Sequence, residues 1–84
     1  MPRYFFHSAD GERSYDEEGV ELADDEAARN AAVGYAGEVL RYGGSELWDH
    51  GQWRVEVTDQ EHQLLFTVIT LAVDAPARPR RSST

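Results

Sequence analysis

The chain has 84 residues, which is enough for one small domain and too few for two separate cores. It contains no cysteine, so disulfides, thiolate zinc sites and cysteine nucleophiles are excluded. Sixteen acidic residues oppose eight basic ones, and the net charge of -8 disfavours direct binding to the phosphates of nucleic acid.

The first 22 residues predict two strands and two turns. Residues 3–8 are rich in aromatic side chains and are followed by Asp10-Gly11, a pair that favours a tight hairpin turn. The next segment is polar and contains a second turn, where Gly19 supplies the positive φ that closes it. We therefore expect a first strand at 3–8 and a short second strand at the edge of the sheet.

Residues 25–42 predict the single helix. Asp24 is a suitable N-cap, and the acidic residues Asp25 and Glu26 stabilise the first turn through the helix dipole. Apolar residues recur at three- and four-residue steps and form one stripe: Ala28, Ala32, Tyr35, Ala36, Val39 and Leu40. The pair Gly43-Gly44 is expected to end the helix.

Two further strands follow the helix. The segment 53–58 alternates between apolar and polar residues, and its apolar members are Trp53, Val55 and Val57. This alternation predicts a strand that is covered on one face. After a turn at 59–63, the segment 64–73 is almost unbroken in its apolar character, which predicts a strand buried on both faces.

The last residues differ in composition from the rest of the chain. Residues 75–84 have no periodicity and contain two prolines together with Arg78, Arg80 and Arg81. We interpret them as a flexible tail that follows a single domain at 1–74.

The order of these elements predicts an α+β fold, a two-layer ββαββ domain with one helix packed on one face of a small antiparallel sheet. One helix leaves the other face open, and both faces of the predicted strands carry large apolar side chains. Burying each is worth roughly 1.5–3 kcal/mol, so we expect the open face to meet a second copy or another protein. Alternatively, the loop bearing Leu47 and Trp48 covers it. The predicted interface residues are Tyr4, Phe6, Phe66 and Val68, with Trp48 at the margin.

Several segments resemble a known family when taken in order over residues 1–73. They are the opening MPRYFFH, the Asp10-Gly11 turn, the acidic segment 16–22, the alanine-rich helix and the strand at 55–59. Together they resemble a widespread family of short bacterial proteins, a domain of unknown function, whose members often carry a glycine where this chain has Glu61-His62. The resemblance implies kinship and no activity. The strand–strand–helix outline is also similar to small antitoxin domains that neutralise ribonuclease toxins.

The sequence offers no catalytic or metal site. The acidic stretch 10–26 has the wrong spacing for a calcium-binding loop and is better explained as a solvated turn and a helix cap. His7, His50 and His62 are not at metal-ligand spacing. If the first strand is central, His7 faces the open side near Glu56. We expect no catalytic residue, no metal and no cofactor.

These patterns predict a noncatalytic protein-interaction or regulatory module that self-associates through its sheet as a homo-oligomer, most simply a dimer. Two alternatives stay open: an antitoxin-like partner of a ribonuclease toxin, and a small metal- or ligand-binding protein. An unidentified protein partner is compatible with each, whereas a nucleic-acid partner is not expected. The chain has no apolar run long enough for a signal peptide or a membrane helix, so we expect a cytoplasmic protein without membrane contact.

Overall fold

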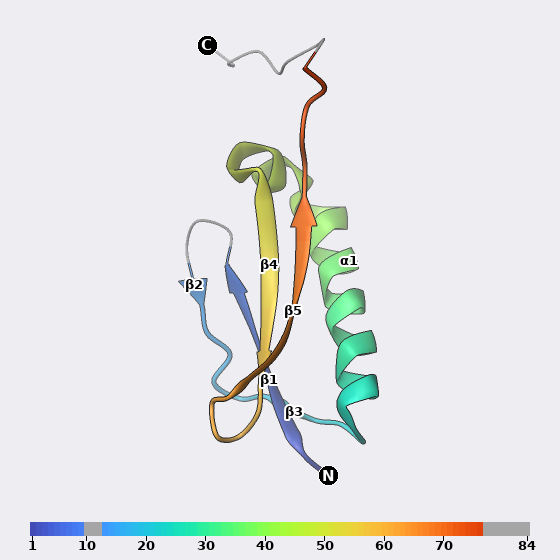
Figure 1. Ribbon diagram of the computed structural model, residues 1–84, viewed down its shortest axis with the longest axis vertical. Helices are drawn as coiled ribbons and strands as arrows, with labels where there is room; N and C mark the ends of the chain where they lie inside the picture. Colours follow the sequence, from blue (N-terminus) through green and yellow to red (C-terminus); the bar gives the residue numbers. More distant parts are fainter. Residues whose placement is uncertain (10–12, 77–84) are drawn as a thin grey trace.

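A computed structural model of the protein describes residues 1–9 and 13–76, with the backbone alone at 44–46. Its elements are β1 (Arg3–Ala9), β2 (Arg13–Ser14), β3 (Val20–Glu21), α1 (Asp25–His50), β4 (Gln52–Thr58) and β5 (Leu64–Leu71). The strands form an antiparallel sheet in the order β2-β1-β4-β5, and β3 also pairs with β1. α1 packs against β4 and β5 and runs along their length (Figure 1). The predicted two-layer α+β fold is confirmed, with the second strand divided into β2 and β3.

The turn between β2 and β3 is held by one carboxylate. Asp16 Oδ1 accepts hydrogen bonds from the backbone N–H groups of Glu18 and Gly19, at 3.0 and 3.1 Å. Gly19 has a φ of +70°, and a Cβ at this position would lie 2.8 Å from the Phe5 ring and 2.9 Å from the Tyr4 carbonyl oxygen. The predicted need for glycine in this turn is therefore confirmed, and the turn brings β3 back alongside β1.

Two sequence predictions concern residues outside the described part of the chain. The first is the turn at Asp10-Gly11, and the second is most of the tail, residues 77–84. The register of the flanking strands, with Ser8 opposite Ser14, is the antiparallel pairing that a hairpin requires.

α1 is longer than the sequence predicts. It begins as expected, because the Asp24 carboxylate caps it by accepting from the N–H of Ala27 at 2.9 Å. Gly43, with φ -127° and ψ 29°, interrupts the helical geometry without ending the helix. The helix ends at Gly51, whose left-handed φ of 81° lets its N–H bond to the Leu47 carbonyl at 2.7 Å. No helix in the described part of the chain is long and apolar enough to cross a membrane.

The core lies between α1 and the sheet. Its buried residues are Ala28, Ala32 and Ala36 of the helix, Trp53, Val55 and Val57 of β4, and Tyr4 of β1. Alanine side chains allow the helix to approach the strands closely. Tyr35 stacks on Trp53 with a centroid separation of 5.9 Å and closes one side of this core. The predicted covered face of β4 is confirmed.

β5 is an edge strand, and the prediction that both of its faces are buried is wrong. Among the strands that the structure describes, it pairs with β4 alone. Leu64, Ile69 and Leu71 are 56%, 55% and 64% exposed. A run of apolar residues predicts burial, but it does not distinguish a central strand from an edge strand with nothing beside it.

Candidate functional site

The predicted interface residues of β1 lie on the helix side of the sheet. Tyr4 is 2% exposed, and its hydroxyl donates to Asp25 Oδ1 of α1 at 2.7 Å. This bond is the main reason why the pKa of Tyr4 rises to about 12, because the neighbouring carboxylate stabilises the protonated phenol. Phe6 is opposite Val57 in the register and packs against the same core. Their predicted placement on the face opposite the helix is therefore wrong.

The predicted interface residues of β5 are on the helix side as well. Phe66 is opposite Val57 and Val68 is opposite Val55, so both side chains share the face that α1 covers. The guanidinium of Arg29 lies over the Phe66 ring at 5.7 Å from its centroid. Their placement on the open face was likewise wrong, because alternation shows which residues share a face without showing which face the helix covers.

Trp48 is half-exposed, at 47%, near the end of α1. Its neighbour Leu47 packs against the core on the helix side. The alternative in which a loop bearing these two residues covers the open face is therefore wrong, because both belong to the helix.

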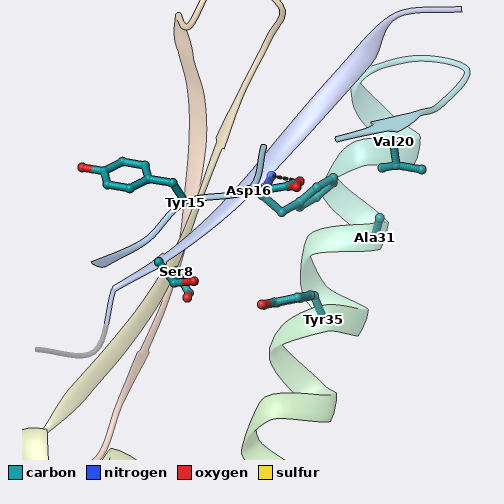
Figure 2. Close-up of a pocket in the computed structure, with 8 residues that line it drawn as sticks. Ser8, Tyr15, Asp16, Val20, Ala31 and Tyr35 are labelled. Carbon is teal, nitrogen blue, oxygen red and sulfur yellow. Dashed lines mark hydrogen bonds between the residues drawn. The ribbon is translucent and has the colours of Figure 1, made fainter. Parts of the chain in front are cut away.

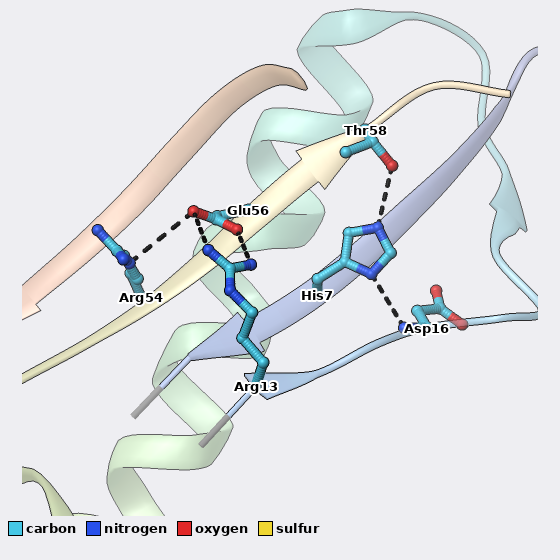
Figure 3. A network of polar contacts seen from close by, with 6 residues as sticks. All are labelled: His7, Arg13, Asp16, Arg54, Glu56 and Thr58. Carbon is cyan, nitrogen blue, oxygen red and sulfur yellow. Dashed lines mark hydrogen bonds and ion pairs between the residues drawn. The ribbon is translucent and has the colours of Figure 1, made fainter. Parts of the chain in front are cut away.

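The open face carries a network of ion pairs. Arg13 of β2 contacts both carboxylate oxygens of Glu56 on β4, at 2.6 and 3.4 Å, and Arg54 Nε lies 3.8 Å from Glu56 Oε2 (Figure 3). The hydrogen bond from Arg13 holds the pKa of Glu56 below its ordinary value, since it outweighs partial burial, which acts in the other direction. Charged groups thus cover the β2 and β4 part of the open face, whereas Ile69, which is opposite Arg54, is exposed on its β5 part.

His7 joins three parts of the same face. β1 is a central strand and His7 is opposite Glu56 in its register, which confirms the expected position. Its Nδ1 accepts from the backbone N–H of Asp16 at 3.0 Å, so Nε2 carries the proton and donates to Thr58 Oγ1 at 3.0 Å (Figure 3). The ring of Tyr15 meets the imidazole edge to face at 5.5 Å. Both ring nitrogens form hydrogen bonds, so His7 links the sheet to the turn. Neither nitrogen is free to bind a ligand.

Asp16 is the second organising residue of this region. Its Oδ2 accepts from the backbone N–H of Phe6 at 3.2 Å, and its Oδ1 holds the turn at Glu18 and Gly19. Partial burial pushes the pKa of Asp16 upward, but the hydrogen bonds from Gly19, Phe6 and Glu18 outweigh it and keep the pKa below the ordinary value. The carboxylate is therefore ionised at neutral pH.

A cavity of about 470 Å³ lies between β1, the segment that includes Asp16, and α1 (Figure 2). Its lining consists of Phe6, Ser8, Ser14, Tyr15, Asp16, Val20, Ala31 and Tyr35. The cavity exists because α1 lies over β4 and β5, which leaves the β1 side of the sheet less covered. No sequence motif indicates it, since it depends on where the helix lies on the sheet.

Four of the described acidic residues of the stretch 10–26, Asp16, Glu21, Asp24 and Asp25, serve local structure. Besides Asp16 and the cap Asp24, Glu21 pairs with Arg3 at 3.2 Å. Within residues 1–9 and 13–76, no group of three or more potential metal-ligating side chains comes together. The Arg78, Arg80 and Arg81 cluster lies outside the described residues.

The turn between β4 and β5 differs from a glycine-containing one. His62 has a φ of +64°, a left-handed conformation that favours glycine. The Asp59 carboxylate supports this turn by accepting from the N–H groups of Glu61 and Gln63, at 2.9 and 3.0 Å. The turn thus keeps a tight geometry without a glycine, through the side chain of Asp59.

Comparison with known proteins places the chain in a family. A family model described as a domain of unknown function (DUF6894) matches residues 3–72. The chain belongs to this family. The assignment agrees with the resemblance found in the sequence. Because the function of the family is unknown, the assignment does not indicate an activity. No curated protein matches the chain, and no solved structure matches it.

Proposed function

We propose that this protein is a noncatalytic interaction module that forms a homodimer by pairing β5 with β5 of a second copy. The observation that carries the proposal is the free edge of β5, which is long, apolar and uncharged. Residues 64–73 contain no charged side chain, in a chain where charged residues make up 29%. Three of its apolar side chains, Leu64, Ile69 and Leu71, are more than half exposed.

The free edge of β5 lacks the features that normally keep an edge strand from associating. Every second residue of an edge strand points its N–H and C=O outward, and charged residues, prolines or very short strands usually discourage pairing there. The eight residues of β5 contain neither proline nor charge. Such a segment either pairs with another strand or promotes aggregation.

The opposite edge of the sheet contrasts with β5. It consists of β2 and β3, two residues each, separated by the turn that Asp16 holds. Arg13 and Glu21 on these strands form ion pairs with Glu56 and Arg3. Short strands and charges make this edge a poor template for a second strand. The two edges therefore differ in a way that favours association through β5.

Antiparallel pairing of two β5 strands generates a symmetric dimer with one continuous sheet, in which both helices lie on the same face. Strands are spaced about 4.8 Å apart, so helices centred over the β4–β5 midline come about 10 Å from each other across the two-fold axis. This separation is at the upper end of the 8–10 Å typical of packed helices. Val33, which is 62% exposed, lies on the same flank of α1 as Arg29, the flank that faces β5.

The test is the mass of the full chain in solution, measured by light scattering over a series of concentrations. The substitution Ile69→Lys places a charge on the β5 edge, and Tyr42→Lys places the same charge on a helix residue that is 80% exposed. Ile69 is opposite Arg54 in the register, so its side chain lies on the open face, where a neighbouring β5 strand covers only part of it. Cross-strand contacts of this kind are worth about 0.2–1 kcal/mol each, and lysine at 69 in both copies therefore weakens dimerisation roughly 2- to 30-fold.

We expect the unsubstituted chain and the Tyr42→Lys variant to approach twice the monomer mass as concentration rises, and the Ile69→Lys variant to need a concentration roughly 2- to 30-fold higher to do so. A chain that is monomeric at every concentration contradicts the proposal. Equal dimerisation of the two variants contradicts the assignment to β5.

A further inference from the structure

We infer that the cavity between β1 and α1 is a binding site for a small organic amine that carries a flat apolar group. The cavity lies on the β1 side of the helix, whereas the proposed dimer uses β5, so this inference is independent of the proposed function. Its volume of about 470 Å³ falls within the 300–1,000 Å³ typical of small-molecule sites.

The walls of the cavity suit a flat apolar group. Phe6 of β1, Val20 of β3 and Ala31 of α1 supply apolar surface. Ala31 has only a methyl group, which leaves open space between the helix and β1. Tyr35 reaches from the helix toward β1, with its hydroxyl directed to the Ser8 side (Figure 2).

The charge of the lining selects a cation. Asp16 is the one charged residue among the described residues that line the cavity, and it is held ionised by three backbone N–H groups. A carboxylate has about four acceptor positions, so three internal hydrogen bonds leave room for one more donor. The described lining residues include no basic group to balance an anion, and the chain as a whole carries a charge of -8.

The remaining polar groups are available to the same ligand. The side chains of Ser8, Ser14 and Tyr35 form no hydrogen bond with any other described residue. Their hydroxyls both donate and accept, so they accommodate a polar substituent at the end of the ligand away from Asp16. A protonated amine beside the Phe6 ring also gains from the negative face of the aromatic system.

The experiment uses three probes of nearly equal shape and different charge: 2-phenylethylamine, 2-phenylethanol and phenylacetate. Each is titrated into the isotope-labelled full chain, and backbone amide shifts are followed by NMR. We expect the amine to shift the amides of Asp16, Val20 and Ala31, and to bind about tenfold more tightly than the alcohol, because hydrogen bonds to a charged acceptor are stronger. Phenylacetate is expected to leave these amides unchanged.

Two substitutions on the helix distinguish binding in the cavity from binding on the surrounding surface. Ala31→Phe fills the cavity and should abolish the amine shifts. Asn30→Phe adds the same ring to an exposed position of α1 outside both the cavity and the flank that faces β5, and should leave them unchanged. Asp16→Asn should remove the preference for amine over alcohol. Because Asp16 also holds the turn, this substitution can alter the fold as well, so Ala31→Phe is the decisive variant.

The inference is overturned if none of the probes shifts these amides, or if the amine and the alcohol bind equally to the unsubstituted chain. It is also overturned if Ala31→Phe leaves amine binding unchanged.

Discussion

The substitution Val55→Ala tests which face of the sheet contains the core. Val55 is fully buried in the structure, between α1 and the neighbouring strands. Removing two methyl groups forfeits about 1.6 kcal/mol of transfer free energy, and the cavity left behind raises the loss to about 2–3 kcal/mol. The total stability expected for a chain of this length is only about 4–13 kcal/mol. The midpoint of thermal unfolding should therefore fall by about 8–24 °C.

The assay is thermal unfolding followed by circular dichroism at one fixed protein concentration. Val73→Ala is the matched control, because it removes the same two methyl groups from a side chain that is 79% exposed. Its free energy of unfolding should stay within about 0.5 kcal/mol of the original. Similar losses in the two variants would refute the assignment of the core to this face of β4.

Further predictions concern the turns and the titrating groups. Gly19→Ala should lower the free energy of unfolding by more than about 1 kcal/mol, as measured by denaturant unfolding. The φ of +70° is strained for alanine, and the added Cβ would contact β1 too closely. His62→Gly should stabilise it by roughly 0.5–1 kcal/mol in the same assay, since its φ of +64° suits glycine. Ultraviolet titration should find one tyrosine with a pKa of about 12, absent from Tyr4→Phe. Because its pKa is raised by folding, Tyr4 contributes stability that is present below about pH 10 and is lost as pH rises toward 12. Asp16 and Glu56 have lowered pKa values, so stability should fall as pH drops below about 4–5, and Glu56→Gln should flatten part of this fall.

The element types could be predicted from the sequence because local patterns determine them. The alternation at Trp53, Val55 and Val57 predicted both the strand and its covered face, and the structure confirms both. The helix start at Asp24 followed from capping chemistry, which is local as well. The helix end was predicted too early at Gly43, because a glycine pair permits a stop without requiring one, and Gly51 supplies the left-handed cap instead.

The faces of the outer strands could not be predicted in the same way. β1 carries Phe5 on one face and Tyr4 and Phe6 on the other, so alternation alone does not show which face meets the helix. The choice depends on tertiary contacts such as the hydrogen bond from Tyr4 to Asp25. The predicted placement of Tyr4, Phe6, Phe66 and Val68 on the open face was wrong for this reason.

The polar network of the open face was only partly visible in the sequence. The pairing of His7 with Glu56 was expected for a central first strand, and the register confirms it. Arg13 and Glu56 are 43 residues apart, so their ion pair depends on β1 holding β2 and β4 on its two sides. Contacts of this kind follow from topology, and no short motif encodes them.

The most direct test of the central claim is hydrogen exchange at the backbone amides of β5, measured residue by residue at low and high protein concentration. Pairing of two β5 strands predicts that alternate amides within Leu64–Leu71, those that point away from β4, become protected as concentration rises. The amides bonded to β4 should be protected at both concentrations. Fast exchange of the outward amides at every concentration would contradict the account, because the edge of β5 would then remain open to water.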